Sequence, residues 1–131
     1  GYGGELAERC GITIARELRA GDTIELGAQK LHIYEAPGHI DDQICLYPVD
    51  DHRVVVGDAI FPGGPGKTWS AAGFRTTLKT LRNVILPWPD DTECYPGHGE
   101  PFRLGDIRTQ IEAFLNKAHR LDFFGDASWE E

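Results

Sequence analysis

Three apolar stretches of this sequence end in the same way, at a glycine turn that is followed by a histidine or an aspartate. The three segments are Ala36-Pro37-Gly38-His39, Val55-Val56-Gly57-Asp58 and Tyr95-Pro96-Gly97-His98. An apolar run bounded by glycine and proline is typical of a β-strand and the turn that follows it. The sequence therefore predicts that His39, Asp58 and His98 lie at three strand ends.

His39, Asp58 and His98 are residue types that bind catalytic metal ions. Zinc in such sites takes imidazole nitrogens and carboxylate oxygens and keeps one position open for water. A bound divalent metal lowers the pKa of that water to about 7, so hydroxide forms at neutral pH without a serine or cysteine nucleophile. Each residue alone has a simpler interpretation, because a histidine after a Pro-Gly turn is often a surface residue and Asp58 is placed to accept backbone N–H bonds in a turn. The metal-site hypothesis therefore rests on all three residues together.

The apolar pattern predicts two pairs of strands before residue 60. Residues 23–26 and 31–34 flank a turn at 27–29, which predicts a hairpin. Residues 43–47 and 53–56 form a second pair around the polar turn 49–52, and the continuous run at 54–56 is typical of a strand covered on both faces. The Gly- and Pro-rich stretch 61–73 predicts an irregular loop.

Helical spacing predicts two amphipathic helices in the second half of the chain. The first covers residues 74–85 and stops before Pro87, and the second covers residues 107–118 after Gly105-Asp106. A short strand is expected at 92–95, a short helix at 5–10 that Gly11 ends, and a loose tail at 122–131. This order predicts an α/β fold with helices on one face of a mixed sheet. The length suits a single domain over residues 1–131.

Composition excludes several classes of partner. The net charge of −8 argues against nucleic acid, whose phosphates require a basic surface. No run of about 18 apolar residues occurs, so no membrane association is expected. The three cysteines are far apart and form no Cys-x-x-Cys pair, which predicts neither a disulfide framework nor a thiolate metal site and suits the reducing cytoplasm.

Gly66-Lys67-Thr68 raises a different hypothesis, because a glycine-rich loop that ends in Gly-Lys-Thr is able to cradle the phosphates of a nucleotide. The first glycine of that motif falls at position 61, which is Phe61. Residues 69–73 also delay the helix whose N-terminus the phosphates need. Nucleotide binding at Lys67-Thr68 is therefore the weaker alternative.

Together the motifs resemble the metallo-β-lactamase superfamily, and within it the glyoxalase II-like metallohydrolases. Besides the three segments above, the matching residues are Gly21-Asp22-Thr23-Ile24-Glu25-Leu26 and the loop Phe61-Pro62-Gly63-Gly64-Pro65-Gly66-Lys67-Thr68. The resemblance spans nearly the whole chain to about residue 115. It implies that the chain is one βα half of an αββα sandwich.

The resemblance also implies hydrolysis of a thioester, a lactone or another ester-like bond in a small-molecule substrate by a metal-bound hydroxide. His39 would bind the first metal, His98 would bind the second, and Asp58 would bridge the two as the catalytic carboxylate. One or two zinc ions are implied for the complete site, and iron or manganese suits the same ligands.

One motif of the family is missing from these residues. The His-x-His-x-Asp-His motif, which supplies most of the other ligands, would precede Tyr2, and no such arrangement occurs in the sequence. We therefore expect a chain that corresponds to the C-terminal half of the fold and is inactive or weakly active by itself. The alternative is a non-catalytic half-domain, in which the uncovered sheet face packs on a second copy or on the missing N-terminal half.

Overall fold

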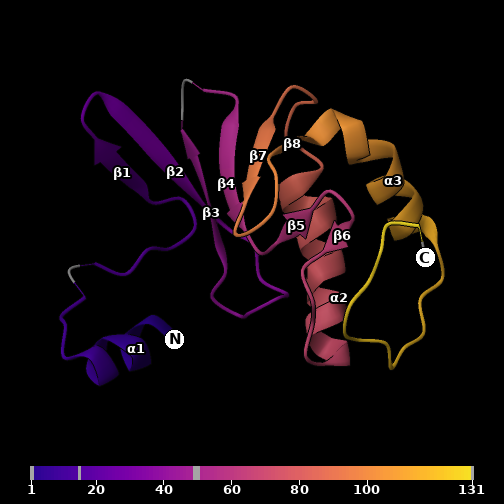
Figure 1. Cartoon of the computed structure of the whole chain (residues 1–131), viewed down its shortest axis with the longest axis horizontal. Helices are drawn as coiled ribbons and strands as arrows, with labels where there is room; N and C mark the ends of the chain where they lie inside the picture. The colour runs from indigo at the N-terminus through magenta and orange to yellow at the C-terminus, as the bar shows by residue number, and fades with distance from the viewer. Residues whose placement is uncertain (1, 15, 49–50, 131) are drawn as a thin grey trace.

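A six-stranded mixed sheet forms the centre of the computed structural model, which describes residues 2–14, 16–48 and 51–130 (Figure 1). Its strands are β1 (Thr23–Leu26), β2 (Gln29–Glu35), β3 (Ile44–Pro48), β4 (Arg53–Gly57), β7 (Glu93–Pro96) and β8 (Phe102–Arg103). The strand order is β1-β2-β3-β4-β7-β8, in which β4 and β7 pair in parallel and the other neighbours pair antiparallel. The predicted mixed sheet is therefore confirmed.

The first four strands correspond to the two predicted pairs. In the β1–β2 hairpin Leu26 pairs with Gln29, which leaves a two-residue turn. Gly27 opens this turn with a φ of 60°, a left-handed conformation that glycine adopts without steric cost. Strands β3 and β4 form the second pair; positions 49 and 50 of the predicted turn between them lie outside the described residues.

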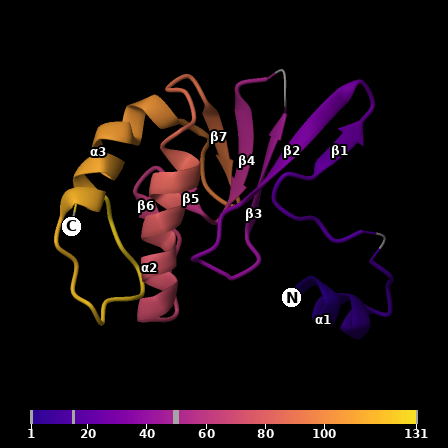
Figure 2. The same ribbon diagram turned by 180° about the vertical axis from the view of Figure 1, so that it is seen from behind.

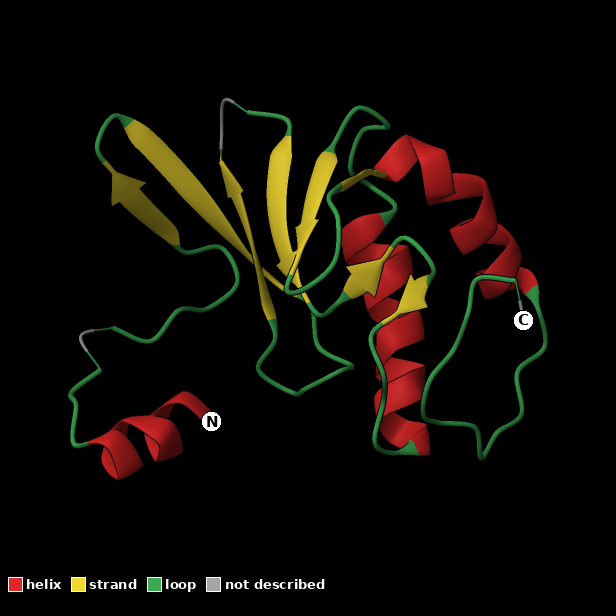
Figure 3. Cartoon of the chain, viewed as in Figure 1, coloured by secondary structure: helices red, strands yellow, loops and turns green. Residues whose placement is uncertain are grey.

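Helix α2 (Ala71–Thr80) connects β4 to β7 and begins three residues before the predicted start. Ser70 caps it, since its Oγ accepts a hydrogen bond from the backbone N–H of Gly73 at 3.0 Å. A π-helical turn, η1 (Leu81–Ile85), continues α2 as far as the predicted end before Pro87. The predicted helix at 74–85 is thus confirmed as a helical segment (Figure 3), and its last turn is π-helical.

The other two helices are α3 (Leu104–Asn116) and α1 (Tyr2–Cys10). Figures 1 and 2 show α2 and α3 together near the β7–β8 end of the sheet, and α1 apart from them near the other end. Gly11 ends α1 with a φ of 66°, as predicted. None of the helices in the described part of the chain is long and apolar enough to cross a membrane.

The hydrophobic core lies between the sheet and the two helices α2 and α3. On β4, Val54 and Val56 are fully buried in this core, whereas Val55 points to the opposite face and is 49% exposed. Alternate side chains of a strand point to opposite faces, so α2 and α3 cover one face of the sheet. The prediction of helices on one face is confirmed for these two helices.

The stretch predicted to be an irregular loop contains a second, two-stranded sheet. Its strands are β5 (Ile60–Phe61) and β6 (Gly64–Pro65), which pair antiparallel. In the same stretch, Thr68 is only 1% exposed, so this part of the loop packs into the fold. Strand-length patterns do not detect a hairpin with two residues in each strand.

The tail is anchored, so the expectation of a loose tail over residues 122–131 is wrong at Trp129. This side chain is 2% exposed and packs edge-on against Phe114 of α3, with ring centroids 5.5 Å apart. Its backbone N–H donates to the carbonyl oxygen of Gly63 at 3.0 Å. Burial of the large apolar surface of the Trp129 ring stabilises the tail in this position, although the neighbouring residues are polar.

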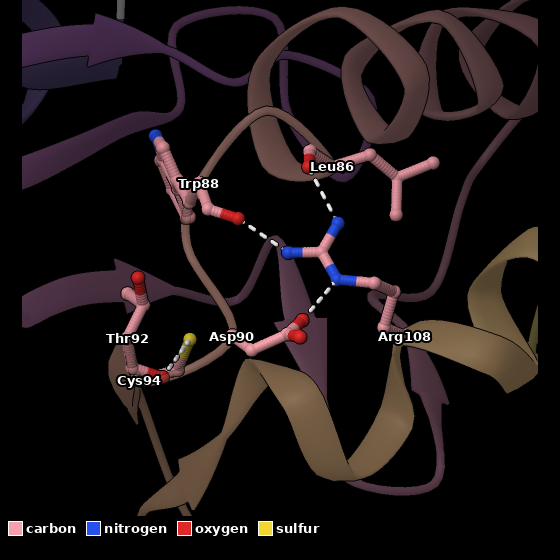
Figure 4. A network of polar contacts seen from close by, with 6 residues as sticks. All are labelled: Leu86, Trp88, Asp90, Thr92, Cys94 and Arg108. Carbon is pink, nitrogen blue, oxygen red and sulfur yellow. Dashed lines mark hydrogen bonds and ion pairs between the residues drawn. The ribbon is translucent and has the colours of Figure 1, made fainter.

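Arg108 ties α3 to the turn that follows η1. Its guanidinium donates to the backbone carbonyls of Leu86, at 2.6 Å, and of Trp88, and it pairs with the carboxylate of Asp90 (Figure 4). The planar guanidinium reaches all three acceptors because its N–H groups point in fixed, diverging directions. We refer to Arg108, Leu86, Trp88 and Asp90 as the arginine clamp.

Candidate functional site

Sheet topology brings the three candidate ligands to the same edge of the sheet. Strands β2, β4 and β7 run in the same direction, because β2 and β4 are both antiparallel to β3 and because β4 and β7 are parallel. Their C-terminal ends therefore lie at one edge. His39, Asp58 and His98 follow these three ends, as the sequence predicts.

The shared partner of the two histidines is the Asp58 carboxylate. Nε2 of His39 lies 3.5 Å from Oδ2 of Asp58, and Nε2 of His98 lies 3.8 Å from Oδ1. Asp58 thus presents one oxygen to each imidazole. This is an arrangement that a bridging carboxylate requires.

The backbone around Asp58 leaves no space for larger residues. Gly57 adopts a φ of 56° and accepts a hydrogen bond from the N–H of Gly97 at 2.8 Å. A Cβ at Gly97 would lie 2.3 Å from Oδ1 of Asp58, and a Cβ at Gly66 would lie 1.9 Å from its backbone oxygen. Glycine at both positions lets the chain approach the carboxylate closely.

The His39 ring is oriented by the backbone. Its Nδ1 lies 2.7 Å from the carbonyl oxygen of Lys67. A carbonyl only accepts, so Nδ1 carries the proton and donates it, and a neutral His39 then has its lone pair on Nε2, the atom that faces Asp58. An Nδ1–H bond to a backbone carbonyl is the usual support of a histidine that binds a metal through Nε2.

His98 is held differently and is more exposed than His39. Its ring stacks on Phe61 of β5, with centroids 4.6 Å apart and planes 24° from parallel. The His98 side chain is 76% exposed, against 21% for His39. The stacked ring fixes the plane of the imidazole and leaves one of its faces open to solvent.

One oxygen of Asp58 lacks a hydrogen-bond partner. Oδ1 is buried, and no group in the described residues donates a hydrogen bond to it. A buried acceptor left without a partner costs about 1–3 kcal/mol, and more when it is charged. A cation bound at this oxygen removes that cost.

The distances fit part of a metal site. Two ligands about 2.1 Å from a tetrahedral zinc ion lie about 3.4 Å apart, close to the 3.5 Å between His39 and Asp58. Among the described residues, however, no group of three or more His, Cys, Asp and Glu side chains is arranged so that it could hold a metal ion. Each His–Asp58 pair would supply two of the ligands that zinc takes, and a closed site would need further ligands.

Two of the remaining histidines, His52 and His119, have structural contacts. Nδ1 of His52 lies 3.0 Å from the Asp91 carboxylate, at the opposite ends of β4 and β7 from the candidate ligands. Nε2 of His119 bonds the carbonyl of Phe114 at 2.7 Å. These contacts satisfy the rings within the fold.

The loop around Lys67 and Thr68 does not have the open form of a phosphate cradle. Thr68 is buried, and its hydroxyl accepts a hydrogen bond from the backbone N–H of Gly125 at 3.1 Å. Lys67 pairs with Asp126 at 3.8 Å and lies over the ring of Trp69. The structure therefore gives no support to nucleotide binding here.

Sequence reasoning missed two supports of the candidate site. They are the Lys67 carbonyl, which orients His39, and the Phe61 ring, which stacks on His98. A backbone carbonyl leaves no trace in residue type. The Phe61 position follows Asp58 closely, and an aromatic residue so near a predicted ligand was the one available signal.

Comparison with known proteins places the chain in a family. A family model described as the metallo-beta-lactamase superfamily matches residues 12–122. The chain belongs to the metallo-β-lactamase superfamily. The resemblance inferred from the motifs, with its mixed α/β sheet, is thereby confirmed.

Individual relatives are similar at low identity. The hydroxyacylglutathione hydrolase of Polaromonas sp. is 31% identical over 87 residues, which cover 65% of this chain and 33% of the relative. Hydroxyacylglutathione hydrolase GloC of Haemophilus influenzae is 29% identical over 97 residues, which cover 73% and 45%. The chain thus spans less than half the length of these two relatives.

Solved structures share the fold. The crystal structure of ETHE1 from Myxococcus xanthus is similar with a TM-score of 0.67 and 26% identity, over 88% of this chain and 57% of that one. The chain thus matches somewhat more than half of that solved structure.

Proposed function

We propose that this chain contributes His39, Asp58 and His98 to the active site of a metal-dependent hydrolase that cleaves a thioester or another ester-like bond. The observation that carries the proposal is the position of both Nε2 atoms within 3.8 Å of the two oxygens of one carboxylate. The names of the relatives support the thioester, because a hydroxyacylglutathione is a thioester of the glutathione thiol.

The residues of this chain would act by binding and orienting. When bound, a divalent metal acidifies a water molecule so that it attacks a carbonyl carbon at neutral pH. His39 would bind the metal through Nε2, because its Nδ1–H donates a hydrogen bond to the Lys67 carbonyl. Asp58 would direct Oδ2 toward His39 and Oδ1 toward His98. His98 would add a second imidazole nitrogen on the Oδ1 side of the carboxylate.

The donor set does not select one metal. Imidazole nitrogen and carboxylate oxygen suit zinc, iron and manganese. We propose zinc as the first metal to test, in one or two ions, because its ligand spacing agrees with the His39–Asp58 distance.

Calorimetric titration of the purified full chain with Zn²⁺ tests the proposal. The matched variants are His39→Ala and His98→Ala, with His52→Ala as control because His52 lies at the other end of its strand. We expect each ligand variant to lower the zinc affinity at least about tenfold and the control to leave it unchanged. Equal affinities in all four proteins would contradict the proposed ligand set.

Activity is measured separately, with thioester and lactone substrates in the presence of zinc. Hydrolysis that His39→Ala abolishes and His52→Ala retains would support an active chain. Zinc binding without hydrolysis would limit the proposal to a partial site. Such a site needs ligands beyond those that the described residues bring together.

As a second candidate function, we propose self-association through the sheet face opposite α2 and α3. Val55, 49% exposed, faces this side, and its neighbours in register are Leu46 on β3 and Tyr95 on β7. The register pair Arg53 and Glu93 lies on the same face and adds one charge of each sign. A face with apolar centre and both charges is complementary to its own copy across a two-fold axis.

Light scattering at micromolar concentration tests self-association. We expect the mass of a dimer for the unmodified chain and of a monomer for Val55→Lys. Leu121→Lys is the control, because Leu121 is 85% exposed and lies after α3, outside the sheet. A monomer mass for the unmodified chain would refute this second proposal.

A further inference from the structure

The C-terminal tail crosses the loop that surrounds the candidate ligands. We define the strap as residues 125–130 and the site loop as residues 59–68. Trp129 donates to the site loop twice, from its backbone N–H to the carbonyl of Gly63 at 3.0 Å and from Nε1 to the carbonyl of Phe61 at 3.1 Å. A Cβ at Gly64 would lie 2.1 Å from the carbonyl oxygen of Ala127. The strap therefore lies directly on the β5–β6 hairpin.

A second anchor lies at the other end of the site loop. The N–H of Thr68 donates to the carbonyl of Gly125, and the N–H of Gly125 donates to the hydroxyl of Thr68, both at 3.1 Å. Thr68 is 1% exposed, so these reciprocal bonds are shielded from water. The exposed ion pair between Lys67 and Asp126 adds little by comparison.

The site loop in turn contacts both histidines. Phe61, whose carbonyl accepts from Trp129, stacks its ring on His98. The backbone carbonyl of Lys67, which precedes the anchored Thr68, accepts a hydrogen bond from the Nδ1–H of His39. One anchor of the strap therefore includes Phe61, which itself supports His98. The other anchor is Thr68, the neighbour of Lys67, which supports His39.

The hairpin requires this external support. Strands β5 and β6 have two residues each, and an isolated two-stranded hairpin is at best marginally stable in water. Trp129 supplies the missing support because its ring is 2% exposed and is fixed edge-on against Phe114 of the core helix α3. The position of Phe61 is thus coupled to the core through the tail.

We propose that the strap positions the two histidines: Trp129 sets His98 through Phe61, and the Thr68–Gly125 pair sets His39 through Lys67. Trp129 and Thr68 are positioning residues in this scheme and touch neither substrate nor metal. The proposal rests on the proposed function only in its consequence for metal binding. The orientation of the rings is a property of the metal-free chain.

The test uses two conservative variants of the full chain. Trp129→Phe retains an aromatic ring against Phe114 and loses the Nε1 hydrogen bond, and Thr68→Val retains the shape and loses the hydroxyl. Trp88→Phe is the matched control, because Trp88 is also buried and its Nε1 has no hydrogen-bond partner in the part of the chain that the structure describes. Thermal unfolding checks that all three proteins fold.

The first readout is NMR of the imidazole ¹⁵N and ring ¹H resonances without metal. We expect Trp129→Phe to shift the ring resonances of His98, because the Phe61 ring that stacks on His98 is then no longer held in place. We expect Thr68→Val to shift the ring resonances of His39. Trp88→Phe is expected to shift neither. Unchanged His39 and His98 resonances in both strap variants would overturn the proposal, whether or not the chain binds metal.

The second readout is the absorption spectrum and affinity of added Co²⁺. Loss of a group that orients a ligand lowers metal affinity about 10- to 100-fold, so we expect this loss in both strap variants and not in the control. If no variant and not even the unmodified chain binds Co²⁺, the proposed metal site fails while the resonance shifts still decide on the strap. Shifted resonances with Co²⁺ affinity equal to that of the unmodified chain would overturn the positioning role.

Discussion

Replacing Arg108 by alanine removes the arginine clamp and is expected to destabilise the fold by about 3 kcal/mol. The side chain is 23% exposed and donates to the part-buried carbonyls of Leu86 and Trp88. Each of these charge-assisted bonds contributes about 1.5 kcal/mol net, the low end for a bond to a charged group, because its loss leaves a carbonyl without a partner. The Asp90 carboxylate is 72% exposed, so the ion pair adds less than about 1 kcal/mol.

Urea unfolding followed by circular dichroism measures this loss, with a fall in Tm of roughly 10 °C as the thermal counterpart. Arg108→Lys retains the charge without the planar fork and is expected to recover less than half of the stability. Arg82→Ala, an exposed arginine on η1, is the control and should change stability by no more than about 0.5 kcal/mol. A loss below about 1 kcal/mol for Arg108→Ala would refute the clamp as a stabilising element.

Two further predictions concern the carboxylate and the thiols. Gly97→Ala places a Cβ 2.3 Å from Oδ1 of Asp58 and pushes the end of that side chain away, so zinc affinity should fall at least about tenfold with little loss of stability; Gly63→Ala, where a Cβ meets nothing within 4 Å, should match the unmodified chain in calorimetry. Burial raises the pKa of Cys45 and of Cys94 to about 12 from the ordinary thiol value of 9.0. The unfolded chain therefore loses these protons above about pH 9 while the folded chain keeps them, so unfolding titrations should show stability falling as pH rises from about 9 toward 12. At pH 8 a thiol reagent should modify only the exposed Cys10 of the native chain. Rapid labelling of all three cysteines would contradict the burial of the other two.

The secondary structure followed from the sequence wherever local patterns decide it. The helical spacing of apolar residues from Phe74 predicts the body of α2 because the periodicity reflects the buried face. The three residues before Phe74 carry no such period, so the start of α2 depends on the cap at Ser70. The β5–β6 hairpin was missed because its strands are shorter than any periodic signal.

The candidate site was predictable as a set of residues and not as a geometry. His39, Asp58 and His98 stand out because each follows a strand and a glycine turn. Their convergence depends on the parallel pairing of β4 with β7, which no local pattern encodes. The metal itself and the complete ligand set stay predictions, to be decided by the titrations above.

The sequence by itself determined the family, the order of the helices and of the strands of four residues or more, and the residue types at the strand ends, because dihedral preference and the burial of one face act over a few neighbouring residues. Only the tertiary structure decided which groups support those residues. Trp129 and Phe61 are 68 positions apart, and Lys67 and His39 are 28 apart. Such contacts form when the tail, the loop and the sheet pack together, and their backbone acceptors are the same in every residue type.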